Sequence, residues 1–216
     1  LNRFSHGFGI QYDQSVAALT VLARILWLQG RSAEARRTAN QALEIALQID
    51  HGLSICYTLA LAGCPIALYE GQTQLAHQRV KLLHSHAHKH SVLLFYTWAQ
   101  HYARLLDLPT HPSSPASGLL RDILLTLRGG TVDARQLERA RSGEAGWCAA
   151  EILRCHALHQ PDEIAQGLLQ QALEIARQQG ALVWEMRSAL SLARLWLRQH
   201  RPAPARELLQ QVLCKC

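Results

Sequence analysis

Apolar residues recur along this chain with the period of an α-helix. Between residues 15 and 29, for example, Leu19, Leu22 and Leu26 are spaced three and four residues apart and share one helical face. The same periodicity predicts further helices over 33–48, 52–69, 74–88, 91–107, 118–127, 132–141, 144–158, 162–179, 182–199 and 203–213. Because β-branched residues are sparse, we predict an all-α fold.

Two stretches of the sequence recur at a distance. The segment from Arg24 to Arg36 returns near the other end of the chain as Arg194 to Arg206. The segment from Gln41 to Ala46 returns in the same way as Gln171 to Ala176. The offsets of the two recurrences differ by about 40 residues, which predicts stacked helix pairs of that length.

Small residues lie where the helices of each predicted pair would cross. In the first pair, Ala23, Ala35 and Ala42 allow the two helices to approach closely, and Gly30 turns the chain between them. This pattern is similar to that of tetratricopeptide repeats, which implies a right-handed superhelix of antiparallel helix pairs. The predicted repeat-packing positions are Ala23, Gly30, Ala35, Ala42, Gly71, Ala76, Ala193 and Ala205.

The predicted helices group into about five pairs after a lead-in segment over 1–14. The pairs cover 15–48, 52–88, 91–128, 132–179 and 182–213, and the fourth begins irregularly. Ser32 is a predicted N-cap, Pro65 should kink its helix or restart it, and the proline-rich stretch 109–115 predicts an exposed loop. Since the chain opens at Leu1 within a sequence of structured character, we expect a fragment of a larger protein.

The net charge limits the classes of partner. The chain carries a formal charge of +6, but its arginines are scattered and interleaved with acidic residues, so we expect no direct contact with nucleic acid. No apolar run approaches the roughly 20 residues of a membrane helix, and no signal-peptide pattern opens the chain. We therefore expect a cytoplasmic protein without membrane contact.

The six cysteines form no CxxC pair. Small buried thiols in a reducing compartment are the favoured interpretation. Cys214 and Cys216 form a CxC sequence that could bind a soft metal, and the alternative is an ordinary interrupted helical turn.

Four histidines alternate along one predicted helix end. His84 and His88 would share one face, and His86 and His90 another, so that each pair could hold a metal ion. No nearby acidic pair offers a third ligand, and a solvated helix end is the alternative. The sequence also lacks a phosphate loop, a dinucleotide fingerprint, a nucleophile elbow and a zinc-binding HExxH helix. We therefore expect neither an enzyme nor a cofactor.

A binding groove is the remaining candidate site. In tetratricopeptide stacks the first helix of each pair lines the concave face, and arginines with aromatic residues suit carboxylates or peptide segments. Projected onto this chain, that face carries Thr20, Arg24, Trp27, Trp98, His101, Tyr102, Arg187, Arg194 and Arg198. The alternative is that the aromatic residues form the core and the arginines are merely solvated.

Two longer stretches carry a resemblance to a known family. They are 4–13, which leads into the first hairpin, and 172–209, together with the tryptophan-containing stretch 146–154. They resemble the C-terminal tetratricopeptide region of bacterial STAND-type signalling ATPases, in which a winged-helix or nucleotide cyclase domain precedes the ATPase. The chain departs from that pattern between Leu108 and Glu144, where one more helix pair would be expected.

The resemblance implies a regulatory array. Such an array would bind a protein or peptide partner, or a small inducer, and would restrain or release the ATPase and DNA-binding domains preceding it in the same chain. Two other functions remain open at this stage: a metal-responsive module that uses His84, His86, His88 and His90, and a free-standing scaffold or oligomerisation domain.

Overall fold

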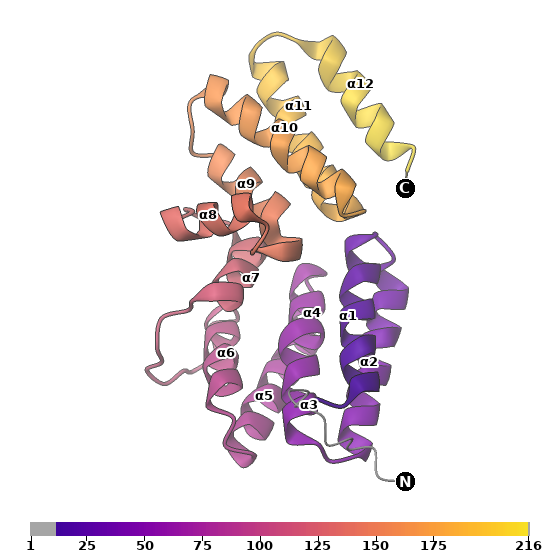
Figure 1. The fold of residues 1–216 in the computed structure, drawn as a ribbon, viewed down its shortest axis with the longest axis vertical. Helices are drawn as coiled ribbons and strands as arrows, with labels where there is room; N and C mark the ends of the chain where they lie inside the picture. The colour runs from indigo at the N-terminus through magenta and orange to yellow at the C-terminus, as the bar shows by residue number, and fades with distance from the viewer. Residues whose placement is uncertain (1–11, 216) are drawn as a thin grey trace. The chain divides into compact units, whose positions relative to one another are not determined.

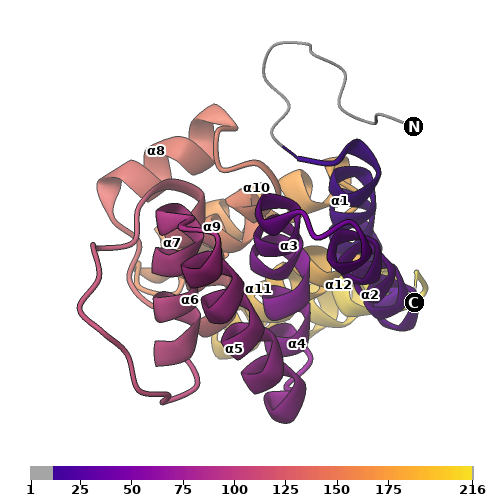
Figure 2. The same ribbon diagram turned by 90° about the horizontal axis from the view of Figure 1, so that it is seen from below.

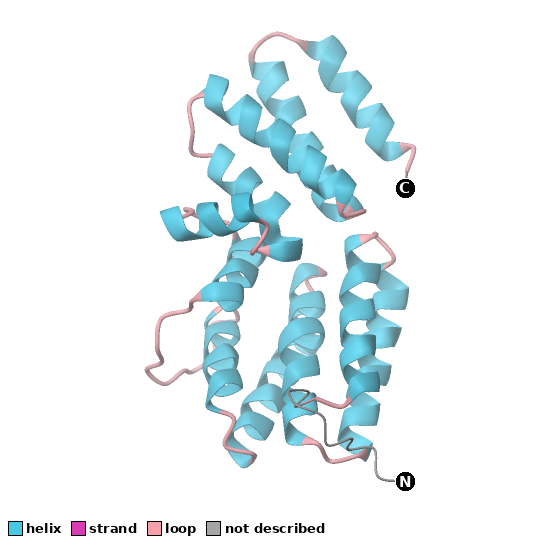
Figure 3. Cartoon of the chain, in the orientation of Figure 1, coloured by secondary structure: helices cyan, strands magenta, loops and turns pink. Residues whose placement is uncertain are grey.

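The regular elements of this protein are all helices (Figure 3). The computed structural model describes residues 12–215, and no strand occurs in that range. The elements are α1 (Gln14–Leu28), α2 (Ser32–Gln48), α3 (Gly52–Thr58), the π-helix η1 (Leu59–Gly63), α4 (Cys64–Tyr69), α5 (Thr73–Lys89), α6 (Leu93–Arg104), α7 (Gly118–Arg128), α8 (Ala134–Ser142), the 3₁₀-helix η2 (Gly146–Cys148), α9 (Ala149–Ala157), α10 (Asp162–Gln178), α11 (Leu182–Arg198) and α12 (Pro202–Leu213). The prediction of an all-α fold is confirmed. Most of the predicted lead-in 1–14, and Cys216, lie outside the described residues.

One local prediction differs from the structure. Ser32 is the first residue of α2 rather than its N-cap; Arg31 precedes the helix, and no side chain caps it. A carboxylate cap occurs instead at α8, where Asp133 Oδ1 accepts a 2.7 Å hydrogen bond from the Gln136 N–H.

The chain forms two compact units that meet in sequence between Ala116 and Ser117. The first contains α2 to α6 and nearly all of α1, and the second contains α7 to α12. The predicted pair 91–128 is therefore divided, because α6 belongs to the first unit and packs against α5, whereas α7 belongs to the second and packs against α9.

The core of the first unit is built around the helical run from Gly52 to Tyr69. Figures 1 and 2 both show α1 beside α2 and α5 beside α6. The prediction that no apolar run approaches the length of a membrane helix is wrong for this run, which is long and apolar enough to cross a membrane. However, 72% of the run is buried, and it packs against α2, α5 and α6. Its position in the core therefore accounts for its composition.

Pro65 interrupts this run through a π-helical turn, in agreement with the predicted break. In the turn, the Cys64 N–H donates to the Leu59 carbonyl oxygen five residues back. The Ala60 carbonyl would need the N–H of Pro65 in the same register, and proline has none. The Tyr102 hydroxyl on α6 donates to that oxygen instead, at 2.8 Å. A tertiary hydrogen bond thus replaces the missing helical one.

Successive helices of the second unit pack as hairpins. Contacts join α9 with α10, α10 with α11, and α11 with α12, which follow one another in Figure 1. In both units the small residues predicted at helix crossings are fully or almost fully buried, as close helix packing requires. They are Ala23, Ala35, Ala42, Ala76, Ala193 and Ala205.

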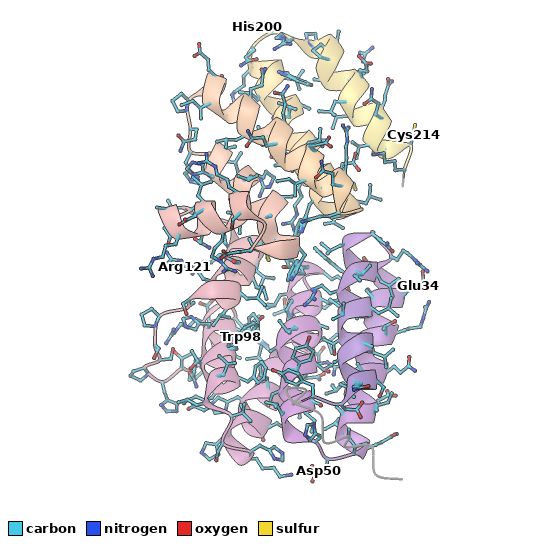
Figure 4. All side chains as sticks on the ribbon, viewed as in Figure 1. Glu34, Asp50, Trp98, Arg121, His200 and Cys214 are labelled. Atoms are coloured by element: carbon cyan, nitrogen blue, oxygen red, sulfur yellow. The ribbon has the colours of Figure 1, made fainter. Side chains whose placement is uncertain are left out.

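Most of the long helices end in the same way. A residue with positive φ follows the helix, and the next N–H donates to the carbonyl oxygen five residues back, which is the Schellman motif. The motif is formed at Gly30, Asp50, Gly71, Ser91, Asp107, Gly180 and His200. Figure 4 labels two of these residues, Asp50 and His200.

From Gly30 to Ser91, and again from Gly180 to His200, successive motifs recur at a nearly constant interval. Two such intervals make one helix pair of about 40 residues, as the recurring segments predict.

The residue type at these positions should set local stability. Non-glycine residues pay a steric cost for positive φ, so Ser91→Gly should raise the free energy of unfolding by about 0.5–1 kcal/mol. Gly71→Ala should lower it by about 1 kcal/mol, because the added Cβ meets no atom within 4 Å and only backbone strain is introduced. Urea unfolding measures both effects. Destabilisation by Ser91→Gly would contradict the assignment.

Candidate functional site

The second unit carries a charged cluster centred on Glu151 of α9, whose side chain is only 1% exposed. Arg154 donates to both carboxylate oxygens, from Nε to Oε2 and from Nη2 to Oε1, each at 2.8 Å. Arg187 of α11 donates from Nη1 to Oε1 at 2.9 Å. Desolvation lowers the pKa of Arg154, but the hydrogen bond and charge of Glu151 outweigh it, so the net pKa is raised. Two guanidinium groups on one carboxylate leave a net positive charge.

Arg187 is positioned by three kinds of contact. Its guanidinium lies over the buried Trp184 ring, 4.9 Å from the centroid, and also donates to the Thr126 carbonyl oxygen at 3.3 Å. The side chain nevertheless remains 37% exposed. Since its position is fixed by Trp184, Thr126 and Glu151, Arg187 presents a preorganised cation at the surface.

Three arginines of α11 lie on one stripe of the helix, which we call the arginine stripe: Arg187, Arg194 and Arg198. Their spacings of seven and four residues keep them on one face. Arg194 is exposed and forms no ion pair with a described residue, whereas Arg198 is exposed and lies 3.4 Å from Asp162. The three arginines predicted for the groove therefore lie on one face of α11.

An exposed apolar strip runs beside the arginine stripe. Met186, Leu190 and Leu197 are between 39% and 53% exposed, although α11 buries its opposite face against α10 and α12. Arginines next to accessible apolar side chains are typical of surfaces that bind protein segments.

The other predicted groove residues are mostly buried in the first unit. Thr20 is fully buried, and its hydroxyl forms a hydrogen bond with that of Thr58. Trp27 stacks on Tyr69 with ring centroids 4.0 Å apart. Trp98 and Tyr102 belong to the core. Figure 4 marks Trp98 on α6. These four side chains are thus not available to a partner, and the alternative interpretation of the aromatic residues as core holds here. Arg24 and His101 are partly exposed, and the His101 Nε2 lies 3.0 Å from the Ser114 carbonyl oxygen.

The histidines at the end of α5 form two separate pairs, as their spacing predicts. The ring centroids of His84 and His88 lie 4.8 and 6.5 Å from that of Tyr96. The His86 and His90 rings stack on each other, with their centroids 5.8 Å apart. Within residues 12–215, no group of three or more His, Cys, Asp or Glu side chains is placed to hold a metal ion. Each pair therefore offers at most two ligands.

Burial of three histidines should make the stability of this protein sensitive to pH. Desolvation lowers the pKa of His84, His86 and His156, and neighbouring cationic groups lower it further. The unfolded chain then binds more protons below the ordinary histidine value of 6.5, so stability should be full above about pH 6.5 and fall as the pH drops towards 5.5. Thermal unfolding at pH 7.5 and 5.5 measures this loss.

A matched pair of variants tests that cause. His86→Gln should reduce the fall in melting temperature between the two pH values. His200→Gln, at an exposed position, should leave the fall unchanged. An equal reduction by both variants would contradict the attribution to burial.

The buried cysteines are poor nucleophiles. Burial raises the pKa of Cys56 and Cys155 to about 11, and it also raises the pKa of Cys64. Among the described cysteines only Cys214 is exposed. The thiols of residues 56, 64 and 155 thus serve packing rather than catalysis.

Two groups of residues at these sites were not predicted from the sequence. One is Glu151 with Arg154, which lie far in sequence from Arg187 and meet it only through the packing of α9 on α11. The other is Lys81, Gln100 and His111, which line a cavity between α5, α6 and the segment after α6 together with His84, predicted only as a metal ligand. Neither carries a motif, and only the tertiary fold brings the residues together.

No protein-family model, curated protein or solved structure matches this chain.

Proposed function

We propose that this chain is a tetratricopeptide-like sensor and protein-interaction array of a bacterial signalling ATPase or transcriptional regulator. Its role is to bind a partner rather than to catalyse a reaction. The ligand of the second unit is a protein or peptide segment that combines acidic with apolar side chains. Binding acts on the ATPase and DNA-binding domains of the same polypeptide through different affinities for their two states.

One observation carries the proposal: the arginine stripe beside the apolar strip of Met186, Leu190 and Leu197. Carboxylates pair with fixed guanidinium groups through charge-assisted hydrogen bonds. Apolar side chains of the same segment would be buried against the strip, which supplies affinity that exposed charges alone do not. The regular spacing of the helix ends supports the repeat architecture of the array.

Selection of peptides from a random display library tests the surface. Selected sequences should combine Asp or Glu with apolar residues, and their binding should weaken as salt rises. Arg194→Glu and Arg198→Glu should each weaken binding about tenfold, because they place a like charge opposite the carboxylates.

Arg206→Glu is the matched control, because Arg206 is an exposed arginine on α12 rather than on α11. It should leave the affinity of the selected peptides nearly unchanged. Peptides without acidic residues, or equal loss in all three variants, would contradict the proposed surface.

The regulatory role has a separate test. The coding sequence upstream of Leu1 should encode a phosphate-binding loop, preceded by a winged-helix or cyclase domain. A reading frame that encodes neither would contradict the role as a regulator, and the chain would then be a helical-repeat adaptor. This outcome is independent of the result of the peptide selection.

A further inference from the structure

A cavity of about 220 Å³ lies in the first unit, between α5, α6 and the segment that follows α6. Its lining divides into two chemical groups. The apolar residues are Val80, Ala99, Ala103, Leu108 and Pro109, and the polar or basic residues are Lys81, His84, Gln100 and His111. No lining residue is acidic. The cavity is smaller than the roughly 300–1,000 Å³ of sites for drug-sized ligands, so its occupant is small.

Gln100 provides a hydrogen-bond donor in the lining of the cavity. Its side chain is 2% exposed, and its Oε1 accepts a 2.9 Å hydrogen bond from the His111 backbone N–H. Because a backbone N–H can only donate, this bond fixes the amide orientation and leaves the Nε2 group at the other end. No described residue accepts from Nε2. Since Gln100 lines the cavity, this amide group can donate to a ligand oxygen placed there.

Basic groups surround this donor. Lys81 forms no ion pair with a described residue, and His84 lies close enough to His111 for their charges to interact. Over residues 73–117 the sequence has four lysines and arginines but a single acidic residue, Asp107. The local charge therefore favours an anion.

The rim of the cavity is fixed by hydrogen bonds. Arg104 Nη2 donates to the His111 carbonyl oxygen at 3.2 Å and to Ser113 Oγ at 2.9 Å. Together with the Gln100 bond, these contacts hold the segment after α6 against its helix. The backbone of His111, one of the lining residues, is thus held in place.

We propose that this cavity binds a small organic acid. The carboxylate accepts from the Gln100 Nε2 amide and pairs with Lys81, and the imidazoles of His84 and His111 offer further N–H donors. The apolar body of the acid packs against Val80, Ala99, Ala103, Leu108 and Pro109. The cavity lies in the first unit alone, and its ligand is independent of the partner proposed for the arginine stripe.

Calorimetric titration of the whole chain with acetate, isovalerate, benzoate and benzamide tests the ligand class. Affinity should increase from acetate to the acids with larger apolar bodies, and benzamide, which has the shape of benzoate without its charge, should bind at least about tenfold more weakly than benzoate. Equal binding of benzamide and benzoate would overturn the carboxylate assignment. Failure of all three acids to bind at millimolar concentration would overturn the site.

Two variants locate the site, with circular dichroism as the check on folding. Lys81→Gln should weaken benzoate binding about tenfold, and Gln100→Glu should abolish it, because the new carboxylate retains the His111 bond but repels the ligand. Lys89→Gln removes the same charge from α5 outside the cavity, next to Asp50, and should have little effect. Equal weakening by Lys81→Gln and Lys89→Gln would show general electrostatic attraction and overturn the assignment.

Discussion

Replacing Glu151 by alanine is expected to lower the free energy of unfolding by about 3–5 kcal/mol, because a buried ion pair loses one partner. The Glu151 side chain is 1% exposed and accepts three hydrogen bonds from Arg154 and Arg187. Without the carboxylate, two adjacent guanidinium groups repel each other in a partly desolvated site. Urea unfolding followed by circular dichroism measures the loss.

Two controls separate burial from charge. Glu174→Ala removes an exposed glutamate of α10 and should change stability by no more than about 0.5 kcal/mol. Replacing Glu151, Arg154 and Arg187 together by methionine should recover much of the loss, since no unpaired charge remains. A loss below about 1 kcal/mol for Glu151→Ala would contradict the role assigned to this cluster.

Tyr102→Ala should lower the free energy of unfolding by about 3–5 kcal/mol, as much as Glu151→Ala, because it leaves a cavity in the core of the first unit. Tyr102 is fully buried, although its position in the sequence suggested a groove residue. Thermal or urea unfolding gives the size of the effect. An unchanged stability would contradict the position of Tyr102 in the core.

Tyr102→Phe isolates the hydroxyl. This variant keeps the ring but leaves the Ala60 carbonyl, at the π-helical turn, without the 2.8 Å hydrogen bond that it accepts. The expected loss is about 1–3 kcal/mol, because a buried acceptor then has no partner. The double variant Tyr102→Phe with Pro65→Ala should show coupling, since alanine supplies an N–H to the helix at residue 65.

The helices could be predicted from the sequence because each buries one regular stripe of small and apolar residues. Periodicity gives that stripe but not which neighbour covers it, and so Trp98 and Tyr102 were assigned to a groove although they pack in the core. The arginine stripe was predictable, since Arg187, Arg194 and Arg198 belong to one helix. Its anchor Glu151 was not, because it lies on another helix.

Helix ends show a second limit of the sequence. Gly30, Gly71 and Gly180 signal their turns, but Asp50, Ser91, Asp107 and His200 adopt the same left-handed conformation without glycine. The cavity residues Lys81, Gln100 and His111 are separated in sequence by a turn and most of a helix. They meet only because the chain after α6 folds back and bonds to Gln100.

The regular spacing of the Schellman motifs constrains how the length of this chain can vary in evolution. One residue added or removed inside a helix turns everything beyond it by about 100° and moves its buried alanines towards water. An insertion at Gly129 and Gly130 lies between two helices and changes no such face, and a Cβ added at either glycine meets no atom within 4 Å. Homologous chains should therefore differ in length between α7 and α8, while the interval between successive helix ends stays fixed.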